Sequence, residues 1–305
     1  MNKVTLNGKP PKDRINLNEK AFITYFSKAR DSNSGVSGVV YHKKTDSLFF
    51  TSNSSNYKGL YKIKYNVAEF DVEKQCDFPL SSLMQGIFIR KGDIYIKLDE
   101  RIYLFDIEKK TFTQIASNLT DTFSYGYCFY DEEKDALLAF KDNGSVGVGE
   151  GGKTESYSFI NKSITEISNV FPTAKVIWNG APVLKDRKLY FIGTDDNKRG
   201  IIAIDIDNGN LTTIKDALPY PTYGVDYLKP FLWNDKIHIF GLNDNIANKY
   251  MYKESESISN WEPAALFTGD SYGAKVIAKN ENEALILHFS TSKNSYEIKK
   301  AYVKE

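Results

Sequence analysis

The sequence predicts an all-β fold that is built from six copies of one four-stranded sheet. Three observations support this prediction: short runs of β-branched and aromatic residues, polar turns between them, and the same order of runs along the chain. The clearest copy spans residues 86–115 and reads GIFIRKGDIYIKLDERIYLFDIEKKTFTQI. Each run is too short for a helix and has the composition of a strand.

The turns of this copy divide it into four strands. Arg90–Asp93 is a polar turn that contains Gly92, a residue that adopts positive φ without strain. Leu98–Arg101 interrupts the next run, and Glu108–Lys110 separates the last two. Short strands with turn residues between them predict an antiparallel meander.

The spacing between the second strands of successive copies gives the length of the repeat. Its central residues are Phe49, Tyr95, Leu138, Tyr190, His238 and Ile286, at steps of 46, 43, 52, 48 and 48 residues. A period of about 40–50 residues made of four strands is typical of a β-propeller. A single four-stranded blade leaves both faces uncovered, and stacking the blades around an axis buries them. We therefore expect a six-bladed β-propeller of antiparallel blades.

We expect one domain over residues 1–305, with an N-terminal closing segment at 1–35. The blades are expected at about 36–75, 86–119, 125–163, 177–218, 225–267 and 273–305. In the third blade the pattern predicts a weak third strand at Ser145–Gly149, a fourth strand at Ser156–Ile160 and an insertion at Asn161–Val176.

The last blade lacks a fourth strand in the sequence, because the chain ends after the run at Tyr296–Val303. An open ring would leave a bare strand edge, which promotes aggregation. We therefore expect Phe22–Phe26 or Val4–Leu6 to pair with the last blade and close the ring.

With this pattern the chain resembles the β-propeller superfamily over nearly its whole length, and its period is similar to that of kelch propellers. It lacks the paired glycines that follow the second strand in kelch repeats, and it lacks the WD40 signatures. The resemblance therefore implies a fold and no family-specific active site.

Composition restricts the classes of partner. Forty basic residues nearly balance 39 acidic ones, and no block of like charge stands out, which argues against nucleic acid or an anionic membrane. Cys76 and Cys128 form no disulfide framework, and Cys128 is interpreted as a buried thiol in an apolar strand. The N-terminus has no apolar signal region and no run reaches transmembrane length, so we expect a cytoplasmic protein or part of a viral particle.

A glycine lies at the start of each expected first strand, and it suggests where the functional face is. These glycines are Gly38, Gly86, Gly126, Gly180, Gly224 and Gly273. Tyr125, Tyr223 and Tyr272 each precede one of them, and first strands line the axis of a propeller. One interpretation is that glycine permits close backbone packing, with tyrosine at the rim. The other is an aromatic ring that binds a partner side chain or a sugar, since tyrosine offers both area and a hydroxyl.

Other residues extend this candidate face. Trp178, Tyr220 and Tyr227 are expected near the tyrosines. Loops rich in Asn, Asp, Ser and Gly join the second and third strands and should emerge on the same side, where binding residues on rigid scaffolds often lie. They are expected at Thr51–Gly59, Gly193–Gly200, Gly241–Asn248 and Ser290–Ser295.

The sequence predicts no catalytic residue, no metal site and no cofactor. The segment Asp205–Asn210 hints at a calcium loop, but the ligand spacing fails and a hairpin turn explains it better. The three histidines, His42, His238 and His288, have no visible partners and are interpreted as strand residues. Asp186, Asp226 and Asp270 lie near expected blade starts, where a pair of carboxylates could act as in a glycosidase, although the sequence does not place any two of them at catalytic separation.

Three classes of function remain open. The first is a non-enzymatic binding or scaffold propeller that recognises a protein through the face around its central channel. The second is a structural or attachment component of a larger assembly, such as a phage tail. The third is a carbohydrate-binding or glycoside-processing propeller.

Overall fold

The structure is a computed structural model, and it describes most of the predicted strands. The described residues are 15–24, 36–52, 58–64, 71–80, 85–125, 127–141, 152–171, 174–176, 183–195, 198–208, 210–215, 229–233, 236–243, 246–253, 261–266, 275–280, 283–290 and 295–303. Within them the chain is almost entirely β-structure, as the sequence predicts.

The first three sheets follow the expected meander, each with four antiparallel strands in sequence order. The first sheet contains β2 (Val36–His42), β3 (Ser47–Ser52), β4 (Gly59–Lys64) and β5 (Asp71–Cys76). The second contains β6 (Gln85–Arg90), β7 (Asp93–Leu98), β8 (Arg101–Asp106) and β9 (Thr111–Ala116). The third contains β10 (Tyr127–Asp131), β11 (Ala136–Lys141), β12 (Gly152–Ser158) and β13 (Ser163–Phe171). A 3-10 turn, η1 (Lys43–Thr45), and one short helix, α1 (Asp121–Tyr125), interrupt the described strands.

The other sheets repeat this plan with two variations. The fourth has five strands: β14 (Ala174–Val176), β15 (Val183–Lys185), β16 (Lys188–Asp195), β17 (Lys198–Asp205) and β18 (Leu211–Lys215), with β14 and β15 both paired to β16. The fifth contains β19 (Lys229–Trp233), β20 (Lys236–Asn243), β21 (Ile246–Lys253) and β22 (Trp261–Leu266). The sixth contains β23 (Lys275–Asn280), β24 (Glu283–Ser290), β25 (Ser295–Val303) and, from the other end of the sequence, β1 (Ile15–Thr24).

The pairing of β1 with β25 supplies the strand that the last repeat lacks. Ile15 lies opposite Val303 and Thr24 lies opposite Tyr296, in antiparallel register with one irregularity between Asn18 and Phe22. The strand starts earlier than the expected Phe22–Phe26 and overlaps it only in part. The alternative, Val4–Leu6, lies outside the described residues.

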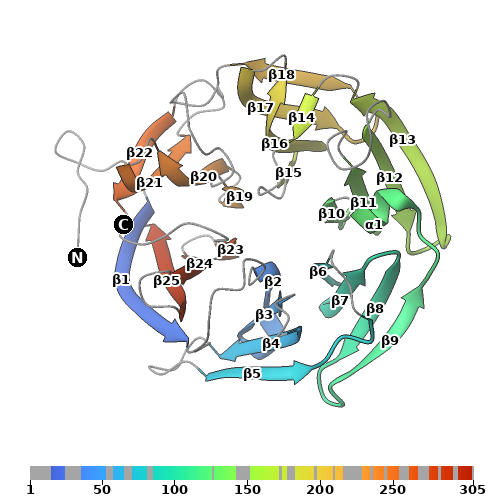
Figure 1. The fold of residues 1–305 in the computed structure, drawn as a ribbon, viewed down its shortest axis with the longest axis horizontal. Coiled ribbons are helices and arrows are strands. Elements are labelled where there is room, and N and C mark those ends of the chain that lie inside the picture. Colours follow the sequence, from blue (N-terminus) through green and yellow to red (C-terminus); the bar gives the residue numbers. More distant parts are fainter. Residues whose placement is uncertain are drawn as a thin grey trace. The chain divides into compact units, whose positions relative to one another are not determined.

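The chain divides into two compact units, and the boundary falls within β14. One unit holds the first three sheets and the turn Asp205–Asn210, and the other holds the rest of the chain. Within the first unit, β6 contacts both β2 and β10, so the first strands of its sheets are neighbours (Figure 1). Within the other unit, β19 likewise contacts β15 and β23.

The expected division of the third sheet is wrong. Its third strand is β12 rather than Ser145–Gly149, which lies outside the described residues, and its fourth is β13, which occupies most of the supposed insertion Asn161–Val176. Ser158 and Ser163 close the β12–β13 hairpin. A register shift in which Glu155 pairs with Glu166 but Thr154 pairs with Ser168 leaves an extra residue in β13. This bulge breaks the alternation by which a strand is recognised.

Two of the segments expected as polar loops lie mostly within strands instead. In Gly193–Gly200 the strands β16 and β17 leave only residues 196–197 between them, and in Gly241–Asn248 only residues 244–245 separate β20 from β21. Gly241 pairs with Lys249 and Asn243 pairs with Ile246, so residues with turn propensity lie within the ladder. Tertiary pairing has overridden local composition here.

Two clusters of buried side chains hold the first unit together. Alternate residues of β7 face opposite sides, as a strand requires. Ile94, Ile96 and Leu98 pack with Phe49 and Leu60 between the first and second sheets. On the other face, Tyr95 packs between the second and third sheets with a cluster that includes Phe88, Phe123, Leu137 and Phe159. Burying a side chain of this size stabilises the fold by about 1.5–3 kcal/mol.

Candidate functional site

The predicted aromatic face has one member among the described residues. Tyr125 is the last residue of α1. The other five residues, Trp178, Tyr220, Tyr223, Tyr227 and Tyr272, lie outside the described residues. The surroundings of α1 are therefore the part of the candidate face whose geometry can be described.

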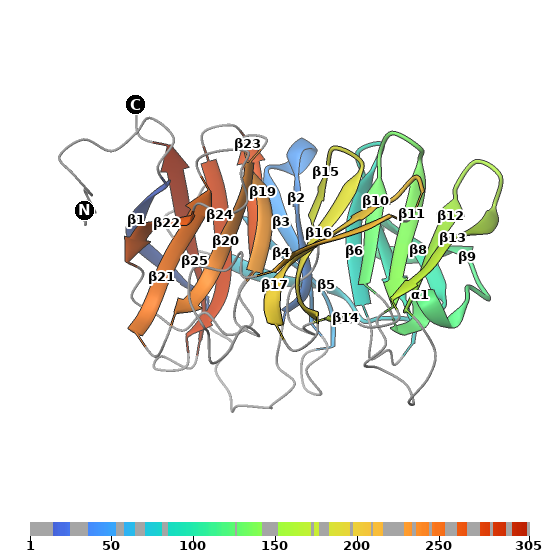
Figure 2. The ribbon, with the colours of Figure 1, turned by 90° about the horizontal axis from the view of Figure 1, so that it is seen from above.

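Helix α1 lies at the edge of the third sheet where β10 begins and β12 begins. We call this the start edge of a sheet, and the opposite edge, where the first strand turns into the second, the turn edge. In Figure 2 the start edge of the third sheet, with α1, is at the bottom and its turn edge is at the top. The helix contacts β11 and β12.

Local hydrogen bonds and one apolar anchor form the helix. The carbonyl oxygen of Thr120 accepts from the backbone N–H groups of Phe123 and Ser124, at 2.9 and 3.1 Å. Leu119 donates its N–H to the carbonyl oxygen of Glu100, at 3.0 Å, which ties the preceding segment to the second sheet. Phe123 is fully buried in the cluster between the second and third sheets. The helix is thus fixed by tertiary packing, which a five-residue helix needs.

Two buried charged side chains hold the two ends of this helix. At the first end, the hydroxyl of Thr120 donates to the carboxylate of Glu155, which is buried on β12. At the last end, Lys97 of β7 donates from Nζ to the carbonyl oxygen of Ser124, at 3.4 Å. The acidic group therefore lies near the N-terminal end and the basic group near the C-terminal end, which is the favourable sense for the helix dipole.

Lys97 is an unusual residue for its place. It is only 1% exposed, in a strand whose other inward residues are apolar. An ammonium has three donors, and the hydrogen bond that Lys97 makes within the described part of the chain, to the carbonyl oxygen of Ser124, is long. Burying such a charge costs free energy that a single long hydrogen bond does not offset.

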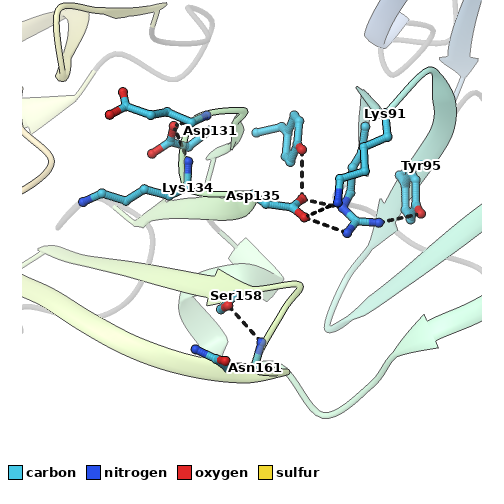
Figure 3. A network of polar contacts seen from close by, with 10 residues as sticks. Lys91, Tyr95, Asp131, Lys134, Asp135, Ser158 and Asn161 are labelled. Carbon is cyan, nitrogen blue, oxygen red and sulfur yellow. Dashed lines mark hydrogen bonds and ion pairs between the residues drawn. The ribbon is translucent and has the colours of Figure 1, made fainter.

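The turn edge of the same two sheets carries a different polar group, which Figure 3 shows. Arg90 forms a two-pronged ion pair with Asp135: Nε lies 2.6 Å from Oδ1 and Nη2 lies 2.9 Å from Oδ2. Lys91 approaches Oδ2 at 2.9 Å, and the hydroxyl of Tyr130 donates to Oδ1 at 2.9 Å. Arg90 also donates to the hydroxyl oxygen of Tyr95, at 3.0 Å.

The ion pair is enclosed and strongly biased toward its charged form. The side chains of Arg90 and Asp135 are 17% and 10% exposed, and the guanidinium carbon lies 4.4 Å from the ring centre of Phe159. The hydrogen bonds from Arg90 hold the pKa of Asp135 well below its usual range. Burial, together with the hydrogen bond to Asp135, raises the pKa of Tyr130 to about 12. Arg90, Asp135 and Tyr130 therefore link two sheets, and none of them exchanges a proton near neutral pH.

Metal-binding clusters and reactive thiols bear on what chemistry the described residues could perform. No group of three or more His, Cys, Asp or Glu side chains that could hold a metal occurs within the described part of the chain. Both cysteines are free, and burial raises the pKa of the Cys76 thiol to about 12, so it is not a thiolate at neutral pH. The same described part contains no helix that is both long and apolar enough to span a membrane.

The remaining sequence candidates have structural surroundings where they are described. The Asp205 carboxylate accepts from the N–H groups of Asp207 and Asn208, at 2.9 and 3.2 Å, in the turn of the β17–β18 hairpin. Asp186 lies in the turn between β15 and β16, with its side chain 72% exposed and next to Lys185, so it is at a turn edge and not at the start of a blade. Asp226 and Asp270 lie outside the described residues, as do the side chains of His238 and His288.

The glycine pattern has a packing explanation at one position. A Cβ added at Gly38 would lie 2.8 Å from Cγ2 of Ile87 and 3.4 Å from its backbone nitrogen, so β2 approaches β6 too closely for a side chain. A Cβ added at Gly86 would lie 3.7 Å from Cβ of Lys97, which is an ordinary van der Waals contact. Close packing therefore explains Gly38 and does not explain Gly86. The other four start-edge glycines lie outside the described residues.

Sequence reasoning missed Lys97, Glu155 and α1. A signal for Lys97 was present, because a lysine interrupts the otherwise apolar run Ile94–Leu98 at a position that alternation places inside. Glu155 and α1 carried no comparable signal, since they are defined by the contact between two sheets.

Comparison with known proteins identifies the fold and no closer kinship. No protein-family model matches the sequence, and no curated protein matches it. A solved structure provisionally described as a gluconolactonase aligns with 94% of this chain and 94% of its own, at 10% identity and a TM-score of 0.57. The crystal structure of a nidogen/laminin complex aligns with 72% of this chain and 76% of that one, at 10% identity and a TM-score of 0.49. The first likeness establishes the fold alone: the chain is an all-β propeller of antiparallel, mostly four-stranded sheets.

Proposed function

We propose that the chain is a non-enzymatic binding propeller that recognises a protein partner through its start-edge face. The binding residues in this proposal are Tyr125, Tyr223 and Tyr272, with Trp178, Tyr220 and Tyr227 beside them. The observation that carries it is the anchoring of α1, because Lys97 and Glu155 hold the helix that ends at Tyr125 from both sides. A tyrosine on a rigid support loses little conformational entropy on binding.

The proposal includes a single domain with six blades and a closed ring. It is supported by the six sheets, by the neighbouring first strands within each unit, and by the antiparallel pairing of β1 with β25. Removal of residues 1–27 should then lower the melting temperature steeply, because the last blade would lose a strand. A truncated protein that melts like the full chain would refute the closure.

A protein partner fits the chemistry better than the other macromolecules. The formal net charge is +1, so no strong field would attract a polyanion. Tyrosine is enriched at protein interfaces because its ring buries area while its hydroxyl keeps a hydrogen-bond partner.

The test compares the full chain with its Tyr125→Ala, Tyr223→Ala, Tyr272→Ala triple variant. A photo-crosslinking residue placed at Trp178 would capture the partner from source cells, and the purified partner would then be titrated by calorimetry. Truncation of an interface hot spot, a class in which tyrosine is enriched, costs at least about 2 kcal/mol, so the triple variant should bind at least about 30-fold more weakly. Lys134→Ala, at the turn edge, is the matched control and should bind normally. Equal affinity for the triple variant and the full chain would reject this face.

A second candidate is lactone hydrolysis, which the structure described as a gluconolactonase favours because it aligns with nearly the whole chain. The assay is hydrolysis of δ-gluconolactone, followed by acid release, with and without added divalent cations. A rate above the uncatalysed reaction that a single carboxylate substitution abolishes would replace the binding proposal. A glycan array separates a sugar-binding face from a protein-binding one.

A further inference from the structure

Strand β9 is an exposed and neutral sheet edge. It is the last strand of the second sheet, paired with β8 on one side and with no described strand on the other. Thr111, Thr113 and Gln114 are exposed, and Ile115 is 37% exposed, a large value for isoleucine. Such an edge presents backbone donors and acceptors to any strand that can approach it.

The outermost strands of the other five sheets carry residues that discourage edge pairing, and β9 does not. Charged residues or proline on an edge strand oppose the approach of another chain. Each of the others contains at least one: β1 has Glu19 and Lys20, β5 has Asp71, Glu73 and Lys74, β13 has Glu166, β18 has Lys215, and β22 has Glu262 and Pro263. The sequence of β9 is TFTQIA, with no charge and no proline.

The local geometry leaves most of β9 available for pairing. A bulge near its end, where Ile102 pairs with Ala116 and Tyr103 pairs with Gln114, makes Ile115 the extra residue. From Thr111 to Gln114 the register with β8 is regular. Phe112 packs against Phe78, Tyr103 and Phe105, so the strand is anchored from within and its edge is not distorted there.

The flanking charges are compatible with a second copy of the same strand. The basic residues nearest to β9 are Lys109 and Lys110, both on its N-terminal side. In any antiparallel pairing centred within β9, these lysines lie opposite residues between 112 and 123 of the other copy. That stretch contains no basic residue and one acidic residue, Asp121. A parallel pairing would instead bring the lysines of the two copies together.

We propose that two copies of this chain associate through antiparallel pairing of β9 with β9 about a two-fold axis. This goes beyond the proposed binding function and does not depend on it. The contact is one strand pair with few side chains, well below a standard interface in area, so the dimer is weak, with a dissociation constant on the order of 10–100 μM. Like charge placed in the middle of the pair should abolish it, because the two-fold axis brings the central residues of β9, such as Thr113, close to their own copies.

The test is sedimentation equilibrium over a concentration series that spans this range. The full chain should shift from monomer to dimer, Thr113→Lys should stay monomeric, and so should Thr113→Glu. An equimolar mixture of Thr113→Lys and Thr113→Glu should dimerise again, because opposite charges then face each other. Thr165→Lys, at an exposed threonine of the outer strand β13, is the matched control and should dimerise like the full chain.

Circular dichroism melts of each variant verify folding, since exposed threonines tolerate these changes. A full chain that stays monomeric up to about 500 μM, several times the expected dissociation constant, would overturn the proposal. Dimerisation of Thr113→Lys equal to that of the full chain would also overturn it. A mixture of the two variants that stays monomeric would point to some other contact and would equally reject the β9 pair.

Discussion

The gap between the first and second sheets and the gap between the second and third are closed by different chemistry, although both flank the same sheet. The first gap is filled by aliphatic residues of β7 against Phe49 and Leu60, and a hydrogen bond links its two sheets: His42 donates from Nε2 to the carbonyl oxygen of Gly92, at 3.0 Å. The second gap is rich in aromatic rings and contains the Arg90–Asp135 ion pair.

The difference shows which interactions distinguish one pair of neighbouring sheets from the next. Apolar packing depends on volume and pattern, so neighbouring blades can share it with different residues. A buried ion pair depends on one partner at one distance, so it selects which two edges meet. The three predictions below test whether the second gap depends on its charges and the first on its close backbone approach.

The largest effect is expected from Asp135→Asn. Asparagine keeps the size of the side chain and tolerates the positive φ of 48° at this position, so the main change is the lost charge. Arg90 would then remain largely buried without its counter-ion, which should lower the free energy of unfolding by about 3 kcal/mol. Urea titration measures it.

The matched control for this prediction is Lys134→Ala, one residue away. Lys134 pairs with Asp207, but its side chain is 52% exposed, so its loss should cost under about 1 kcal/mol. If the two variants were equally stable, the ion pair would not hold the second gap.

An intermediate effect is expected from Gly38→Ala in the first gap. The new methyl group would lie 2.8 Å from Cγ2 of Ile87 and near its backbone, so β2 and β6 must move apart, at a cost of about 1–3 kcal/mol. Gly86→Ala has room and should change stability by less than about 0.5 kcal/mol. Thermal melts of both variants measure these stability changes. If Gly38→Ala left the stability unchanged, close packing would not explain the glycine at this position.

The smallest effect is a pH dependence confined to the second gap. The pKa of Asp135 is lower in the folded chain than its usual value of 3.8, so its stabilisation is complete above that value and is lost as the pH falls toward the folded pKa. The stability difference between the natural chain and Asp135→Asn should therefore be constant at neutral pH and shrink below roughly pH 4. Urea midpoints of both proteins from pH 6 downward measure it. A difference that stayed constant to pH 2.5 would mean that the Asp135 charge does not contribute.

The sequence was sufficient for features that depend on local pattern. Turns such as Arg90–Asp93, together with the short apolar runs, predicted antiparallel strands, and the period predicted a propeller. The missing strand of the last repeat predicted that Phe22–Phe26 or Val4–Leu6 would pair with it. An N-terminal strand does pair with β25, but it is Ile15–Thr24, which overlaps the first of these segments only in part.

Other features could not be predicted, because they depend on residues far apart in the chain. Arg90 and Asp135 are 45 residues apart, and each sits in a turn that looks merely solvated. Glu155 and Lys97 acquire their roles only when α1 lies between their sheets. The strand β13 was hidden by its bulge, whose extra residue shifts the alternation by one.

The pairing of Ile15 with Val303 has a consequence for biosynthesis. A ribosome makes about 5–20 residues per second, so β1 emerges roughly 15–60 s before its partner strand exists. During that interval the nascent chain carries an unpaired strand while the earlier sheets can already form. Contacts of such long sequence separation also slow folding. We therefore expect the sixth sheet to assemble last, after β25 has been synthesised.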